Sequence, residues 1–227
     1  MNRTVKIAAL VTALCLVSAS LFGCNGNAEK AEYFELIKTS SEAAVALESG
    51  EILVHESITA DVEIEGVNNS GNSETFIYFT NGEVPDFELR ATTSIGVDGA
   101  AKQYELIKDG DTVLELVDGV GDFVSEKELP DIFANFRVDF ELNDIKTVVV
   151  ESELKGVKVY KLSMTKAYAD EFDSEVDGVN TDCTDIAYSY YIDSRGTLQK
   201  VVCETASTVT VGGQSQSLVS VVDSAIA

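Results

Sequence analysis

The acidic run Asp173–Gly178 is the stretch of this sequence whose residue types come closest to a metal site. Asp173, Glu175 and Asp177 occupy positions 1, 3 and 5 of the run, and a glycine follows at position 6, as at the start of a calcium-binding loop. Position 12, where such a loop supplies a bidentate glutamate, is Thr184. The motif is therefore an incomplete calcium site. We favour an acidic hairpin loop without metal, and we predict no cofactor.

Cys183 and Cys203 are two further candidates for chemistry, because an oxidising compartment would allow them to form a disulfide. The strands expected to carry them are separated by a turn at residues 194–196. A two-residue loop in this turn sets Cys203 opposite Ile186 or Tyr188 and sends Cys183 to the other face of the sheet. A bridge then requires a bulge that brings the two Cα atoms within about 7 Å. A disulfide and two separate buried thiols both stay open as interpretations.

Catalytic motifs are missing from the sequence. A nucleophilic triad would have to use His55, the single histidine, yet no serine stands in a nucleophile-elbow motif. The glycine-containing segment Asp118–Asp122 carries acids where a phosphate would bind. A zinc site would need more histidines or a C-x-x-C pair, and neither occurs. We predict no catalytic residue and expect that the protein is not an enzyme.

Residues 1–23 have the layout of a secretory signal peptide, with a basic start, an apolar run and a small residue before the cleavage point. The run ends at Leu21-Phe22-Gly23-Cys24, which resembles the lipobox of bacterial lipoproteins. That resemblance implies cleavage between Gly23 and Cys24 and a lipid on the Cys24 thiol. We therefore expect an extracytoplasmic protein that is anchored to a bacterial membrane through this lipid, with residues 24–30 as the lipidated cysteine and a short tether.

The chain is strongly acidic, with 39 Asp and Glu against 16 Lys and Arg and a formal net charge of −23. Such a charge disfavours nucleic acid as a partner and repels anionic lipid headgroups. A covalent anchor is therefore needed to hold this domain at a membrane. The sequence does not predict the oligomeric state.

Hydrophobic periodicity predicts one α+β domain over residues 31–227. A 3.6-residue period over about residues 28–47 indicates a long helix, and strict alternation from Ile52 onward indicates strands with one buried face. A capping box at Ser125–Glu128 predicts a short helix over 129–136, and a second is expected over 165–172. We expect roughly ten antiparallel strands, at residues 52–65, 75–80, 87–95, 103–107, 112–117, 146–153, 157–164, 186–192, 198–211 and 215–222.

The closing hairpin pairs an aromatic strand, Tyr190-Tyr191-Ile192-Asp193, with a return strand that begins Gly196-Thr197-Leu198 and continues to Lys200-Val201. With the lipobox, the short tether and the long helix, this layout resembles the LolA/LolB/RseB/LppX-like superfamily. The resemblance implies one large curved sheet, a half-barrel whose apolar concave face is plugged by helices. It also implies a protein that binds or shuttles a lipid or an acylated partner.

Five positions are our candidates for lining a ligand site on the concave face: Ile58, Val62, Ile64, Tyr188 and Tyr190. The wider set expected to point inward also includes Phe76, Tyr78, Val157, Val159 and Ile186. The alternative is that the long helix fills the concavity and these residues are core. In that case the protein is a partner-binding or sensory lipoprotein of the cell envelope. A calcium-dependent surface protein is the third hypothesis.

Overall fold

The computed structural model describes residues 26–62, 70–82, 86–95, 101–123, 129–152, 156–176 and 178–227. Several features expected from the sequence lie outside these residues: the signal peptide, Cys24, the capping box at 125–128, and the candidate positions Ile64 and Asp177. All the described strands and the described hydrophobic cluster lie within residues 26–227.

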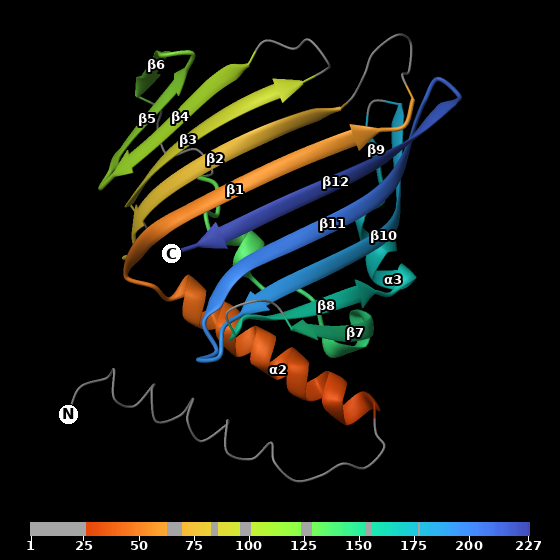
Figure 1. Cartoon of the computed structure of the whole chain (residues 1–227). Coiled ribbons are helices and arrows are strands. Elements are labelled where there is room, and N and C mark those ends of the chain that lie inside the picture. The colour runs from red at the N-terminus through yellow and green to blue at the C-terminus, as the bar shows by residue number, and fades with distance from the viewer. Residues whose placement is uncertain are drawn as a thin grey trace, which may run out of the picture.

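Within the described residues, twelve antiparallel strands form one sheet, in the order β6-β5-β4-β3-β2-β1-β12-β11-β10-β8-β7 with β9 paired to β10. The sheet curves strongly and its edge strands β6 and β7 do not meet (Figure 1). The predicted α+β half-barrel is therefore confirmed. The strands are β1 Ser49–Ala60, β2 Gly71–Thr80, β3 Asp86–Ile95, β4 Lys102–Asp109, β5 Thr112–Val117, β6 Val120–Phe123, β7 Ile145–Ser152, β8 Lys158–Met164, β9 Ser174–Val176, β10 Val179–Ile192, β11 Leu198–Val211 and β12 Gln214–Ile226.

Two of these strands, β6 and β9, were not predicted, and each follows or precedes a tight turn. Asp118 and Gly119 both have positive φ, 51° and 77°, which lets the chain reverse in two residues and return as β6. Gly178 has φ 80° in the turn between β9 and β10. Strands of three and four residues are too short for alternation to reveal them, so the sequence indicated only loops here.

The long helix α2 spans Gly26–Val45 and begins inside the range 24–30 that was expected to be a tether. Asn81 ends it, because its side-chain amide donates to the carbonyls of Val45 and Leu47 at 3.0 and 3.1 Å. None of the helices in the described part of the chain is long and apolar enough to span a bilayer.

Short helical segments complete the fold: η1 Ala134–Phe136, η2 Leu142–Asp144, α3 Lys166–Ala169 and η4 Asp170–Phe172. The helix predicted over 165–172 is confirmed, and the Thr165 side chain caps it by accepting from the Tyr168 N–H. The helix predicted over 129–136 is wrong apart from η1. The Asp131 carboxylate accepts from the Phe133 N–H at 3.0 Å and so competes with helical hydrogen bonding at this point.

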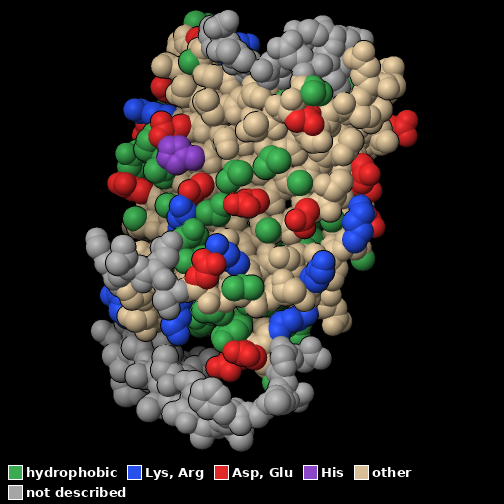
Figure 2. All heavy atoms as spheres, turned by 45° about the vertical axis from the view of Figure 1, so that its right-hand side comes forward, with side chains coloured by type: hydrophobic (Ala, Val, Ile, Leu, Met, Phe, Trp, Pro, Cys, Tyr) green, Lys and Arg blue, Asp and Glu red, His purple; other side chains and the backbone are tan. Residues whose placement is uncertain are grey.

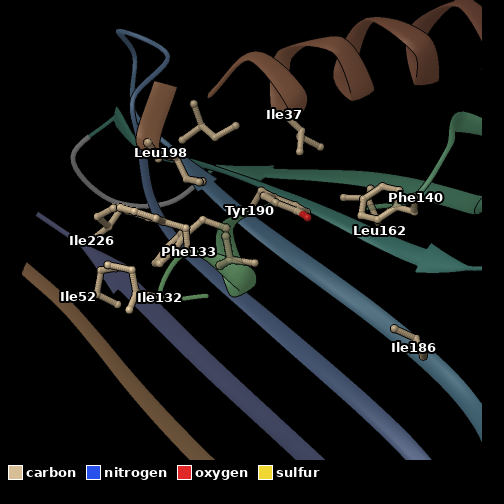
Figure 3. Close-up of a cluster of buried hydrophobic side chains, with 14 of the residues drawn as sticks. Ile37, Ile52, Ile132, Phe133, Phe140, Leu162, Ile186, Tyr190, Leu198 and Ile226 are labelled. Atoms are coloured by element: carbon tan, nitrogen blue, oxygen red, sulfur yellow. The ribbon is translucent and has the colours of Figure 1, made fainter. Parts of the chain in front are cut away.

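One end of the concave face is filled, and we call it the closed end. Large aliphatic side chains stand side by side across five strands there, at Ile226, Ile52, Ile77, Leu89 and Leu106, and all are buried. The segment 129–140 adds Ile132, Phe133 and Phe136 to the same hydrophobic cluster, and helix α2, which contacts β7, β10 and β11, adds Phe34, Ile37 and Ala44. Figure 3 shows Ile37 pointing from α2 toward the strands that carry Leu198 and Tyr190.

The inward register predicted for β2 is wrong. Phe76 and Tyr78 are 42% and 49% exposed on the convex face, whereas Ile77 and Phe79 are buried. All four residues are apolar, so period-two alternation cannot choose between the two faces. Val159 also lies on the side of its strand opposite to Tyr160, which belongs to the core.

The convex face carries charged residues in pairs rather than in a single-sign patch. Arg90 contacts Glu88, Lys161 contacts Glu151, and Lys200 contacts Asp223. Figure 2 shows basic, acidic and hydrophobic side chains interspersed on the side of the molecule that it presents. Exposed pairs of this kind contribute little to stability, and they favour a solvated surface.

Candidate ligand cavity on the concave face

Further along the same strands the concave face is lined by smaller and more polar side chains, and we call this region the open end. On β12, the residues that face inward after Ile226, toward the start of the strand, are Ser224, Val222 and Ser220. On β1, the inward-facing residues after Ile52 are Val54, Glu56 and Ile58. Across the sheet the same rows contain Cys203, Thr205 and Ser73. Most of these side chains are only half-buried, so nothing in the described residues covers them fully.

A cavity of about 370 Å³ lies where the closed end meets the open end. Its volume is within the range of about 300–1,000 Å³ that is usual for small-molecule sites. The segment around η1 forms one side, the α3–η4 segment a second, and strands β10, β11 and β12 the floor. The lining residues are Ala134, Asn135, Arg137, Asp139, Phe140, Tyr168, Glu171, Phe172, Tyr188, Val201, Cys203, Val222 and Ser224.

Aromatic rings form one wall of this cavity. Phe140 stacks on Tyr188 with ring centroids 5.3 Å apart, and Tyr168 meets Phe172 edge-on at 5.3 Å. Phe140 also contacts Tyr168 at 6.1 Å. Such ring pairs stabilise one another beyond the area they bury, so the wall is a rigid apolar surface.

Neutral hydrogen-bonding groups lie beside this wall. The hydroxyls of Tyr168 and Tyr188 are 3.3 Å apart, and Cys203 stands directly opposite Tyr188 in the sheet register. Burial raises the pKa of Tyr168, of Tyr188 and of the Cys203 thiol. All three groups are therefore uncharged at neutral pH. Asn135 reaches across from η1 and donates to the Ser224 hydroxyl at 2.9 Å.

The charged residues of the cavity lie in the segment that follows η1 and in η4. Arg137 donates from Nε to the Asp131 carboxylate at 2.7 Å. This hydrogen bond raises the pKa of Arg137 and pairs its positive charge with that carboxylate. Asp139 and Glu171 also line the cavity. The charge around its mouth is therefore negative on balance.

The predicted ligand-lining residues are only partly brought together. Tyr188 lines the cavity, while Tyr190 is 1% exposed and belongs to the core beside it. Ile58 is half-buried on the open end, and Val62 is 50% exposed just beyond the end of β1. The cavity itself depends on residues that the sequence did not single out, such as Phe140 and Tyr168.

The two cysteines are free in the structure. Cys203 pairs with Tyr188, as one of the predicted registers requires, but Cys183 pairs with Ser207. The expectation that Cys183 faces away from the core is wrong. A bulge between Cys183 and Asp185 shifts the alternation by one residue, so the Cys183 side chain joins the buried cluster.

The described residues of the acidic run lie beside strand β10. Asp173 accepts the Cys183 N–H at 2.7 Å, and Glu175 lies on β9 opposite Asn180. Among the described residues, no group of three or more His, Cys, Asp or Glu side chains is arranged to hold a metal ion. His55 is half-exposed with its Nε2 3.5 Å from Glu74.

The fold and the cavity together define an α+β half-barrel with an apolar-walled site on its concave face. No family model matches the sequence, and no curated protein is significantly similar to it. Among solved structures, the chain is similar to LprF from Mycobacterium bovis, with 13% identity and a TM-score of 0.42 over 87% of this chain and 92% of that one. It is also similar to a putative outer membrane lipoprotein-sorting protein domain from Vibrio parahaemolyticus, with 12% identity and a TM-score of 0.24 over 81% and 87%.

Proposed function

We propose that this chain is a non-enzymatic lipoprotein of the bacterial cell envelope that binds the hydrocarbon chain of a lipid or of an acylated partner on its concave face. One observation carries the proposal: a cavity of about 370 Å³ with an aromatic wall lies at the edge of a concave surface that the helices leave uncovered. Its floor adds Val201 and Val222. The wall and floor formed by Phe140, Phe172, Val201 and Val222 suit an apolar ligand, and the charged residues lie on the other sides of the cavity.

Hydrocarbon burial is the driving force of the proposed binding. Each methylene that leaves water contributes about 0.8 kcal/mol, so several methylenes between Phe140 and Val222 suffice for measurable affinity. A chain longer than the cavity continues over the half-buried open end, past Thr205, Ser220 and Ile58. In this arrangement the ligand occupies the free volume above the small side chains of the open end.

The first test uses residues 25–227, which contain every core residue that the structure describes and lack both the predicted signal peptide and Cys24. The purified protein is extracted with organic solvent, and co-purified lipid is identified by mass spectrometry. Added acyl ligand is expected to raise the melting temperature, because binding to the native state alone stabilises it. Repeated absence of lipid, together with an unchanged melting temperature, would refute the proposal.

The two remaining thiols provide a second readout. Cys203 lines the cavity, and Cys183 is buried outside it. Labelling is done near pH 9, since burial raises the pKa of both thiols and only thiolates react. A ligand at ten times its Kd is expected to slow labelling of Cys203 about ten-fold and to leave Cys183 unchanged. Equal rates for Cys203 with and without ligand would count against the cavity.

A matched pair of substitutions localises the site. Val222→Phe places a ring in the cavity and is expected to weaken acyl binding by about ten-fold or more, because the ring occupies the ligand's volume. Val219→Phe lies on the convex face, where Val219 is exposed, and is expected to leave binding unchanged. Equal losses in the two variants would place binding elsewhere.

Anchoring through Cys24 is the second part of the proposal. The acidity of the chain supports it, since a chain with a net charge of −23 is repelled by an anionic membrane surface and needs a covalent tether. Cys24→Ala is expected to move the protein out of the membrane fraction. A variant that stays there at the wild-type level contradicts the anchor but not the cavity.

A further inference from the structure

We propose that the hydroxyl pair of Tyr168 and Tyr188 binds the carbonyl oxygen of an acyl ester or acyl amide, so that the ligand is an uncharged acyl compound rather than a free fatty acid. This inference rests on the proposed function, since it assigns the polar group that accompanies the hydrocarbon chain. The observation behind it is that two tyrosine hydroxyls 3.3 Å apart belong to the aromatic wall of the cavity, where their neighbours are the Phe140 and Phe172 rings.

Counting hydrogens shows what the pair offers to a ligand. Two hydroxyls carry two hydrogens, and their mutual hydrogen bond uses one of them. The neighbour available to the second is the sulfur of Cys203, which stands opposite Tyr188 and is a weak acceptor. A carbonyl oxygen is a much better acceptor, and a ligand that brings one to this point pairs the second hydrogen. The pair therefore selects an acceptor.

The charges around the cavity select against a carboxylate. Among the described lining residues the cation is Arg137, and its guanidinium is bound to Asp131. Asp139 and Glu171 line the same cavity and repel an anion. A buried carboxylate without a cationic partner is costly, whereas an ester or amide carbonyl needs only one donor.

The position of the pair also fits an acyl compound. Phe140 stacks on the ring of Tyr188, and Phe172 packs on the ring of Tyr168. An acyl chain that runs along these aromatic faces has its first carbon, the carbonyl, next to the two hydroxyls. The rest of the chain then points toward Val222 and the open end, where Ile58, Thr205 and Ser220 face inward beside Glu56.

The test compares probes with the same hydrocarbon chain on residues 25–227. They are 1-monopalmitoylglycerol, its ether analogue 1-O-hexadecylglycerol, which lacks the carbonyl, N-palmitoylethanolamine as the amide, and palmitate. Affinity is measured by the protection of Cys203 from labelling. The ester is expected to bind roughly two- to ten-fold more tightly than the ether, and about ten-fold more tightly than palmitate at pH 7.5. Comparison of the ester with the amide separates the two sources of the carbonyl.

Tyr168→Phe and Tyr188→Phe supply the variants, because each removes one hydroxyl and keeps the ring. Both are expected to abolish the preference for ester over ether while leaving the affinity for the ether unchanged. Tyr78→Phe, on the exposed convex face, is the matched control and is expected to keep the preference. Equal binding of ester and ether by the wild type, palmitate binding as tightly as the ester, or a preference that survives both variants would each overturn this inference while the proposed function stands. Failure of all four probes to bind would overturn both.

Discussion

The closed end and the open end of the concave face belong to the same strands, yet only one of them is core. On β1 and β12 the pair Ile52 and Ile226 is buried at the closed end, whereas Ile58 and Ser220 face each other half-buried at the open end. The alternation of inward and outward residues is the same at both. The two regions differ in the size of the inward side chains and in what packs over them.

Coverage follows from that difference in size. Helix α2 and the segment 129–140 dock where Ile37, Phe133 and Phe136 meet large aliphatic partners, because these contacts bury the most apolar area. The open end offers these helical segments no comparable row of large aliphatic partners beside Ser220, Thr205 and Ser73. A half-barrel thus obtains stability from one end and keeps free volume at the other.

The largest effect that tests this comparison is expected at the closed end. Phe136→Ala removes a ring that is fully buried between α2 and the strands, and it should lower the free energy of unfolding by about 3–5 kcal/mol. Val222→Ala at the open end should cost about 1 kcal/mol or less, since that side chain is half-exposed. Urea denaturation of the two variants measures the difference. Similar losses would mean that the open end is as tightly packed as the closed end.

Substitutions that enlarge a side chain test the same difference in packing between the closed end and the open end. Ala44→Leu forces extra methylenes between α2 and the core and is expected to cost about 1–3 kcal/mol. Ser220→Leu adds a larger side chain to the open end and is expected to change stability by less than about 0.5 kcal/mol. Thermal and urea unfolding provide the measurement. A large destabilisation by Ser220→Leu would contradict the free volume that we assign to this end.

The sequence predicted most helices and strands of the fold, but it did not predict the cavity that they enclose. The helix α2, most strands and the pairing of Cys203 with Tyr188 follow from periodicity and turn chemistry, which are local properties. The choice of face on β2 could not be predicted, because Phe76 and Ile77 are equally apolar. The bulge beside Cys183 has no signal in residue types, and it reverses the face that every residue before it presents.

The cavity was harder to predict than the sheet for a physical reason. Phe140 lies in an irregular segment with no period, so its stacking on Tyr188 depends on a tertiary contact between residues 48 positions apart. Tyr168 was visible only as part of a short helix. A decrease in side-chain size along β12, from Ile226 to Ser220, was readable in the sequence, whereas β1 carries Ile52 at the closed end and Ile58 at the open end.

The smallest expected effect concerns the ion pair that holds the segment between the two ends. Although burial of Asp131 acts in the opposite direction, hydrogen bonds from Arg137 and from the Phe133 N–H hold the pKa of its carboxyl below the ordinary value. A carboxyl whose folded pKa is lowered stabilises the fold above its unfolded pKa of about 3.9, and that contribution is lost as the pH falls through the folded value. Asp131→Asn should therefore be less stable than the wild type at pH 7, by less than about 1 kcal/mol because both side chains are nearly half-exposed.

The pH dependence identifies the cause of that small loss. The gap between wild type and Asp131→Asn should narrow as the pH falls through the lowered pKa of the folded Asp131 carboxyl, because the wild-type side chain then becomes protonated as well. Arg137→Gln should show a gap of the same sign, which likewise shrinks on acidification, and combining the two substitutions should cost less than the sum of the single losses. Melting temperatures at pH 7, 5 and 3 measure these differences. A gap that persists unchanged at pH 3 would mean that the Asp131 side chain acts by its shape in the turn rather than by its charge, and the segment between the closed and open ends would then be held by packing alone.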